Sequence, residues 1–270
     1  MVGPCVNVLF YGVEGLLGSY ESAVKFDGVM KRIGGRVILR GVSFGVRRGE
    51  VFGLIGPNGA GKTTSLRIAA GILRPDNGRV FLFDRLNGQF DPGLRVFVGY
   101  LPEDAGAYRN MRGIDFIRFI AKIYAAYGFN VEDMVDEATR ISNLGDRLWD
   151  RIKTYSKGMR RRLLLAVTLM TKPKLAILDE PNSGLDVYHT VRMRNAILEY
   201  VRRTRGSVLL SSHNMLEVEY LCDRVALISS GRIIDTGTPG ELKKKYGAEN
   251  LEEAFVRALN QAGEGVEVLG

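Results

Sequence analysis

Apolar residues recur along the chain in short runs that predict strands in both halves of the sequence. Within residues 37–46, every second position from Val42 onward is apolar, which is the period of a half-buried strand. Residues 50–55 are mostly apolar and lead directly into a Gly-rich turn, a pattern typical of a buried strand. The same reasoning predicts further strands over residues 24–29, 80–83, 96–101, 174–178, 207–210 and 224–228.

Between residues 101 and 174 the apolar spacing changes to that of amphipathic helices. Apolar positions recur at helical spacing from Ile114 to Tyr124, and two more such stretches cover residues 131–141 and 160–170. Residues 239–260 are typical of two short helices joined near Gly247. A strand-rich first part, a helical block and then alternating strands and helices indicate an α/β fold with a helical insertion.

Composition excludes several classes of protein. The chain has 270 residues, of which 46% are apolar and 25% charged, and this is a globular composition. No apolar run approaches the roughly 18 to 20 residues that a membrane-spanning helix needs. The two cysteines, Cys5 and Cys222, offer no disulfide framework or metal-binding spacing and fit a reducing compartment.

The net charge of +8 comes from one segment of the chain. Residues 151–174 contain eight Lys and Arg residues and no Asp or Glu, so the rest of the chain is balanced. On composition alone, this excess fits nucleic acid, anionic lipid, a phosphate ligand or a solvated helix face. The basic residues of the segment are Arg151, Lys153, Lys157, Arg160, Arg161, Arg162, Lys172 and Lys174.

A phosphate-binding loop is predicted at residues 56–64, which match G-x-x-x-x-G-K-[ST] between a predicted strand and a predicted helix. Glycines let consecutive backbone N–H groups converge on an anion, and the helix N-terminus adds favourable dipole charge. In such a loop Lys62 reaches the β- and γ-phosphates of a nucleotide, and the Thr63 hydroxyl is placed to ligate Mg²⁺. The expected nucleotide-binding residues are Asn58, Gly59, Ala60, Gly61, Lys62, Thr63 and Thr64.

Two acidic residues follow the strand predicted at 174–178. Asp179 is placed to hold the Mg²⁺ shell, and Glu180 is placed to polarise a water molecule against the γ-phosphate. His213 follows the strand predicted at 207–210, at the edge of the sheet where α/β proteins bind ligands. Glu180, His213 and Lys62 are therefore the candidate catalytic residues, and Thr63 and Asp179 are candidate metal ligands.

In order and approximate spacing, these motifs resemble the ATP-binding cassette (ABC) family over about residues 24–260. Residues 155–159, Tyr-Ser-Lys-Gly-Met, are similar to the signature motif of the family, and residues 183–186, Ser-Gly-Leu-Asp, to its D-loop. Asp179 and Glu180 resemble the end of the Walker B strand, and His213 resembles the switch histidine.

The resemblance implies a P-loop NTPase fold with a RecA-like core, an antiparallel β subdomain and an inserted α-helical signature subdomain over about residues 103–170. Residues 1–22 would then form an N-terminal extension, residues 23–260 the ATPase domain and residues 261–270 a mobile tail. The family also implies a dimer in which Ser156 and Gly158 of one protomer bind the γ-phosphate held by its partner. Asp186, in the D-loop, joins them as a candidate ATP-binding residue.

Three positions depart from the common pattern of the family. Ile33 stands where an aromatic residue usually stacks on the adenine; it can pack on a purine but offers no π-stacking. Glu103 stands where the family often has Gln, and as a candidate Mg²⁺ ligand it adds a negative charge. Lys157 replaces a signature glycine and is equally compatible with a γ-phosphate contact or with a solvated side chain.

The resemblance implies the ATP-binding and hydrolysing subunit of an ABC transporter of the export-type branch, with ATP and Mg²⁺ as its cofactors. A separate integral-membrane permease and a second ATPase subunit, identical or different, would be its partners at the cytoplasmic face of the membrane. The alternative is a soluble ABC-type ATPase that acts on ribosomes or DNA. No nucleic acid is expected as a partner, because the basic segment brackets the signature motif and predicts a surface that faces ATP. The other interpretation of that segment is that some of its arginines, Arg160, Arg161 and Arg162 especially, pair with acidic residues elsewhere in the fold.

Overall fold

The computed structural model describes residues 19–86 and 92–263. The extension predicted over residues 1–22 and the tail predicted over residues 261–270 therefore lie mostly outside the described residues. The chain divides into two compact units. The two-sheet unit comprises the described residues of Glu21–Phe90, Ile177–Glu180 and Ser207–Gly270, and the helical unit those of Met1–Tyr20, Asp91–Ala176 and Pro181–Gly206.

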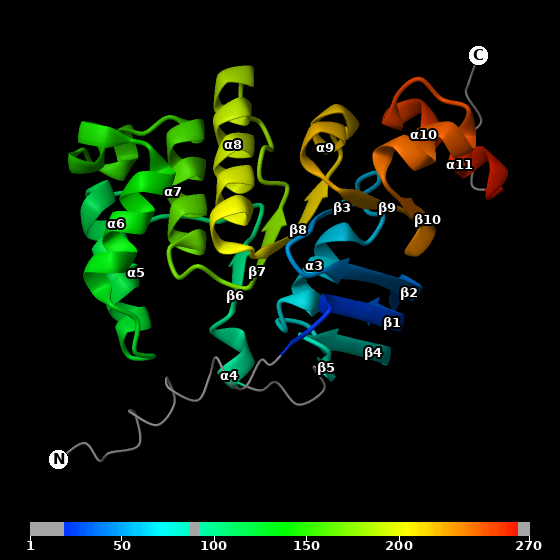
Figure 1. Cartoon of the computed structure of the whole chain (residues 1–270), viewed down its shortest axis with the longest axis horizontal. Coiled ribbons are helices and arrows are strands. Elements are labelled where there is room, and N and C mark those ends of the chain that lie inside the picture. The colour runs from blue at the N-terminus through cyan, green and yellow to red at the C-terminus, as the bar shows by residue number, and fades with distance from the viewer. Residues whose placement is uncertain (1–18, 87–91, 264–270) are drawn as a thin grey trace. The chain divides into compact units, whose positions relative to one another are not determined.

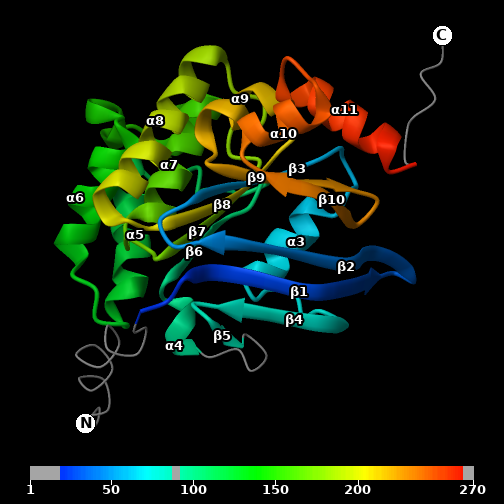
Figure 2. The same ribbon diagram turned by 45° about the vertical axis from the view of Figure 1, so that its right-hand side comes forward.

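Four antiparallel strands form one sheet of the two-sheet unit, in the order β2-β1-β4-β5 (Figure 2). Phe26 of β1 stacks on Phe44 of β2, with ring centroids 4.5 Å apart, and Phe44 stacks in turn on Phe52 of β3 (Val51–Ile55) at 5.6 Å. This row of rings joins the two sheets of the unit and buries large apolar area between them. The strands are β1 (Ser22–Ile33), β2 (Arg36–Arg47), β4 (Asn77–Leu82) and β5 (Arg85–Leu86).

The other sheet of this unit has the order β10-β9-β3-β8, followed by the end of β7. β3 pairs in parallel with both β8 and β9, whereas β10 is antiparallel to β9. Every residue of β3, β7 and β8 is buried, which explains the apolar runs over residues 51–55, 175–178 and 208–210. The remaining elements are α3 (Lys62–Ala69), β7 (Leu175–Asp179), β8 (Ser207–Ser212), α9 (Met215–Leu221), β9 (Arg224–Ser229), β10 (Arg232–Gly237), α10 (Pro239–Tyr246) and α11 (Leu251–Gln261).

In the helical unit, α5, α6, α7 and α8 lie side by side (Figures 1 and 2). Side-chain caps fix where three of them begin: Asn130 caps α6, Ser156 caps α7 and Asp186 caps α8 by accepting backbone N–H groups of the first turn. The elements are α4 (Pro92–Arg95), β6 (Val98–Leu101), α5 (Gly113–Ala125), α6 (Val131–Ser142), the 3-10 helices η2 (Gly145–Trp149) and η3 (Ile152–Thr154), α7 (Lys157–Leu169) and α8 (Val187–Thr204).

The strands and helices predicted from the apolar pattern are present, with boundaries that shift by a few residues. α7 begins at Lys157, three residues before the predicted start, because Ser156 caps it. α10 and α11 confirm the two predicted terminal helices, and Gly247 ends α10 in the left-handed conformation with φ of 63°. The pattern did not predict β10, whose residues are mostly half-buried at the edge of its sheet. No helix in the described ranges combines the length and the apolar composition that a membrane span requires.

Candidate active site

The loop between β3 and α3 has the shape that the phosphate-binding motif predicts. Gly61 caps α3 with φ of 107°, in the region that favours glycine, and a Cβ there would lie 2.6 Å from Leu39 Cδ2. A Cβ on Gly56 would lie 2.0 Å from the Ile228 carbonyl oxygen. Glycine is therefore required at both positions for the backbone to take this path.

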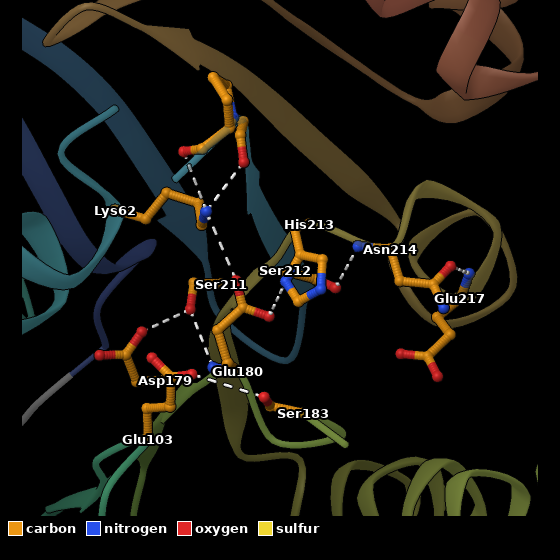
Figure 3. Close-up of polar contacts among 12 residues, drawn as sticks. Lys62, Glu103, Asp179, Glu180, Ser183, Ser211, Ser212, His213, Asn214 and Glu217 are labelled. Atoms are coloured by element: carbon orange, nitrogen blue, oxygen red, sulfur yellow. Dashed lines mark hydrogen bonds and ion pairs between the residues drawn. The ribbon is translucent and has the colours of Figure 1, made fainter. Parts of the chain in front are cut away.

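Lys62 is buried at the start of α3, and its amine turns back into the loop (Figure 3). Nζ donates to the carbonyl oxygens of Gly56 at 2.8 Å and Pro57 at 3.2 Å. The same amine lies 3.4 Å from Glu180 Oε1. The loop thus encloses a positive charge, as a site for a polyanionic phosphate chain requires.

Asp179 ends β7 with its carboxylate next to two hydroxyl groups. Its Oδ1 accepts from Thr63 Oγ1 at 3.2 Å and from Ser211 Oγ at 2.6 Å. The described residues contain no group of three or more His, Cys, Asp and Glu side chains arranged to hold a metal ion. Mg²⁺ commonly binds one or two protein oxygen ligands and completes its shell with waters and substrate phosphates. Thr63 and Asp179 fit such a site.

Glu180 directly follows β7 and has a backbone φ of 45°, which is uncommon for a residue other than glycine. Its N–H donates to Ser211 Oγ at 2.9 Å, so the hydroxyl of Ser211 contacts both acidic residues. Its carboxylate is 7% exposed, and Oε2 lies 2.8 Å from Nδ1 of His213. A carboxylate held between an amine and an imidazole in this way is positioned to accept a proton from water.

The signature motif forms the N-terminus of α7 in the helical unit. The Ser156 hydroxyl accepts the Met159 N–H at 3.1 Å, and Gly158 lies in the first turn. A Cβ on Gly158 would lie 2.3 Å from Cδ2 of His189, whose ring therefore packs directly on this glycine. The N–H of His189 donates to Asp186 Oδ1 at 2.8 Å, so this histidine links the signature motif to the D-loop.

Two of the three residues that differ from the common family pattern, Lys157 and Glu103, contact the D-loop. The exposed side chain of Lys157 reaches Gly184 of this loop, and a Cβ added to that glycine would lie 2.0 Å from Lys157 Nζ. Glu103 Oε1 accepts from the Ser183 hydroxyl at 3.4 Å (Figure 3). Both side chains thus lie against the loop of their own chain.

The structure corrects the interpretation of the basic segment. Arg161 is 7% exposed and donates to the carbonyl oxygens of Pro181, Pro102 and Glu103, at 3.0, 2.8 and 3.0 Å. Arg162 is also buried, and it donates to two carbonyl oxygens at the end of α6. These two residues therefore do not form a solvated face, and their hydrogen-bond partners are backbone carbonyl oxygens in place of acidic side chains.

The predicted site residues thus fall into two groups. The two-sheet unit brings together Lys62, Thr63, Asp179, Glu180 and His213, with Asn58, Gly59, Ala60, Gly61 and Thr64 in the loop or the first turn of α3. Ile33 ends β1 in the same unit and is 46% exposed. The helical unit holds Glu103, Ser156, Gly158 and Asp186.

Sequence reasoning missed two residues of these groups, Ser211 and His189. Two polar residues at the end of an apolar strand were a usable signal for Ser211. The sequence carries no comparable signal for His189.

Comparison with known proteins identifies the family. The profile of the family described as "ABC transporter" matches residues 39–183, and the chain belongs to that family. The linearmycin resistance ATP-binding protein LnrL of Bacillus subtilis (strain 168) is 33% identical over 87% of this chain and 76% of its own length. A fluoroquinolones export ATP-binding protein of Mycobacterium tuberculosis (strain CDC 1551 / Oshkosh) is 36% identical over 76% of this chain and 66% of its own length.

A solved structure of an ATP-binding subunit of an ABC transporter superposes with a TM-score of 0.77 at 25% identity, and covers 88% of this chain and 99% of that one. The fold is that of the ABC ATPase domains, as the motifs predicted. The chain is accordingly an ATP-binding subunit of an ABC transporter and an ATPase, and the alternative of a ribosome- or DNA-directed ATPase is not supported.

Proposed function

We propose that Glu180 is the general base of ATP hydrolysis in this subunit. The observation that carries the proposal is the position of its carboxylate, buried and fixed between Lys62 Nζ at 3.4 Å and His213 Nδ1 at 2.8 Å. Glu180 accepts a proton from the water that attacks the γ-phosphorus. The bond from that phosphorus to the β–γ bridging oxygen breaks, and ADP and phosphate leave.

The neighbouring side chains of the two-sheet unit serve the same reaction. Lys62 offsets the negative charge of the β- and γ-phosphates, and its present carbonyl partners keep the amine inside the loop. Thr63 and Asp179 would hold Mg²⁺, which supplies charge neutralisation between the β- and γ-phosphates when bound. Ser211 positions both acidic residues through its hydroxyl, and His213 orients the Glu180 carboxylate.

The helical unit supplies the parts that act on a partner's nucleotide. Ser156 and Gly158 lie at the N-terminus of a 13-residue helix, where backbone N–H groups and the helix dipole favour an anion. Ser156 is exposed, so it is accessible to a nucleotide held by a second subunit. This supports an ATP-bound dimer in which each signature motif covers the phosphate loop of the other protomer.

Coupling to a membrane protein follows from membership of the family. We infer that a separate permease subunit carries the substrate across the membrane, and that this chain binds it peripherally from the cytoplasmic side. Export is the direction that the relatives favour, because one is named for resistance and the other for export. Closure of the ATP-bound dimer and its reopening after hydrolysis would drive the permease.

The proposed base is tested by replacing Glu180 with Gln, which keeps the shape of the side chain and removes its charge. Steady-state phosphate release should fall at least about 100-fold, while ATP affinity is retained, because general-base assistance is worth roughly 10²- to 10⁴-fold. Glu249→Gln is the matched control: this exposed glutamate lies between α10 and α11, and its replacement makes the same change in net charge. Turnover of Glu180→Gln at the rate of the control would overturn the assignment.

A further inference from the structure

A pocket of about 480 Å³ lies between α6, α7 and α8 in the helical unit. These helices are neighbours in both views of the chain (Figures 1 and 2). The lining includes three arginines, Arg140, Arg162 and Arg192, and one glutamate, Glu199, which gives it a net charge of +2. None of the residues predicted for ATP or Mg²⁺ lines this pocket. We call it the α6–α8 pocket.

Arg162 is the buried charge of the α6–α8 pocket, with 9% of the residue exposed. Its Nη1 donates to the carbonyl oxygens of Ser142 at 3.3 Å and Asn143 at 3.1 Å, but its buried Nε has no hydrogen-bond partner among the residues that the structure describes. No ion pair within the described ranges includes this side chain. A buried guanidinium without an anionic partner is costly, so an anion at this position would stabilise the site.

Arg192 adds a second positive charge to the pocket. Its guanidinium lies over the ring of Tyr188, 4.6 Å from the centroid, and it makes no ion pair with any described carboxylate. Burial lowers the pKa of Arg162, because it disfavours the charged form. The positive charge of Arg192 lowers this pKa further, as expected when two like charges lie near each other. Arg140 does not add to this excess, because it pairs with Glu199 and Glu137.

The rest of the lining is largely apolar. Ile141 comes from α6, and Val191 and Ala196 come from α8. A small inorganic anion would leave this wall uncovered. The volume is within the roughly 300 to 1,000 Å³ typical of pockets for small organic ligands.

We propose that the α6–α8 pocket binds a small organic carboxylate that carries an apolar group. The carboxylate lies against Arg162 and Arg192, because the planar guanidinium fork matches a carboxylate with two parallel hydrogen bonds. The apolar group lies against Ile141, Val191 and Ala196. The site is separate from the proposed ATP chemistry and does not depend on it.

The test uses hexanoate as the probe and the full chain, with binding measured by calorimetry and by methyl NMR spectra. Hexanamide keeps the apolar tail without the charge, and inorganic phosphate keeps a charge without the tail. We expect hexanoate to bind about tenfold or more tightly than either, and to shift the methyl signals of Ile141 and Ala196 but not that of Ile123, an exposed residue on α5.

Arg192→Gln should weaken hexanoate binding about tenfold, the effect of losing one charge-assisted contact. Arg202→Gln is the matched control, since it removes the same charge from an exposed position of α8 outside the pocket. Asn195→Asp provides an independent variant that leaves both arginines in place: it adds a carboxylate to the lining and should also weaken binding. Equal binding of hexanoate and hexanamide, equal binding of phosphate, or equal affinities of Arg192→Gln and Arg202→Gln would overturn the proposal.

Discussion

Glu137 on α6 is the buried centre of an ion-pair network that connects α6 to α8, and its replacement by Gln should destabilise the chain. The side chain is 7% exposed; Arg140 donates to its Oε1 at 2.8 Å, and Arg203 of α8 donates to the same oxygen at 3.1 Å. Gln keeps the shape and one oxygen acceptor but loses the charge that both guanidinium groups contact.

The expected loss of unfolding free energy in Glu137→Gln follows from how exposed Glu137 and its two arginine partners are. A hydrogen bond to a charged group contributes roughly 1.5 to 3 kcal/mol when it is shielded from water. The Arg140 and Arg203 side chains are 35% and 40% exposed, so solvent screens both pairs and can rehydrate the arginines in the variant. We therefore expect the free energy of unfolding to fall by about 2 kcal/mol, which is less than the 3 to 5 kcal/mol of a fully buried pair.

The loss should also depend on pH. Burial raises the pKa of Glu137, but the hydrogen bond and charge of Arg140 and the charges of Arg203 and Lys172 outweigh it, so the pKa lies below its ordinary value of 4.5. A carboxylate with a lowered pKa stabilises the folded state above the unfolded pKa, and this contribution is lost as the pH falls through the folded pKa. The difference between wild type and Glu137→Gln should be constant from about pH 6 to 8 and shrink below about pH 4.5.

Urea unfolding at several pH values measures this difference. Asp136→Asn is the control, because it removes the same charge from an exposed neighbouring position on α6 and should change stability by less than about 0.5 kcal/mol. A Glu137→Gln variant that is no less stable than this control, or whose deficit persists unchanged at the lowest pH, would refute this role for Glu137.

Three further substitutions test other contacts. Gly158→Ala would place a Cβ 2.3 Å from the ring of His189 and should lower ATPase activity about tenfold or more by displacing the signature turn. Gly240→Ala is the control, because no atom of the described residues lies within 4 Å of a Cβ there, and it should leave activity unchanged. Equal activities of the two variants would contradict this role for Gly158. Glu103→Gln should make phosphate release less dependent on Mg²⁺ concentration, because it removes a negative charge that repels phosphate without the metal, and identical Mg²⁺ titrations would contradict that role. Ile33→Tyr should tighten ATP binding several-fold by adding ring stacking worth about 0.5 to 1.5 kcal/mol, and an unchanged ATP affinity would exclude Ile33 from the base contact.

The grouping of Lys62, Asp179, Glu180 and His213 was predictable from the strands of the parallel sheet. The two acidic residues and the histidine lie at the end of a strand or just after one, and the loop that follows β3 leads to Lys62. The carboxyl ends of parallel strands meet at one edge, so residues far apart in sequence gather there. The sequence did not reveal that Ser211 bridges the two acidic residues, since a strand-end serine more often bonds to water or to backbone.

The burial of Arg161 and Arg162 on α7 could not be predicted from sequence patterns either. Three consecutive arginines suggest an exposed surface, because charged residues are rarely fully buried without partners. In the structure, carbonyl oxygens at the end of α6 and in two loops supply those partners for Arg161 and Arg162. Which carbonyls are available depends on how the helices pack, and local sequence does not encode that.

The most direct test of the central claim is the identity of the nucleotide that Glu180→Gln retains. Purified variant and wild type are incubated with ATP and Mg²⁺, separated from free nucleotide, denatured, and analysed by chromatography for ATP and ADP. If Glu180 is the base, the variant binds nucleotide and retains it almost entirely as ATP, whereas the wild type yields ADP. Recovery of mainly ADP from Glu180→Gln, at wild-type occupancy, would contradict the account.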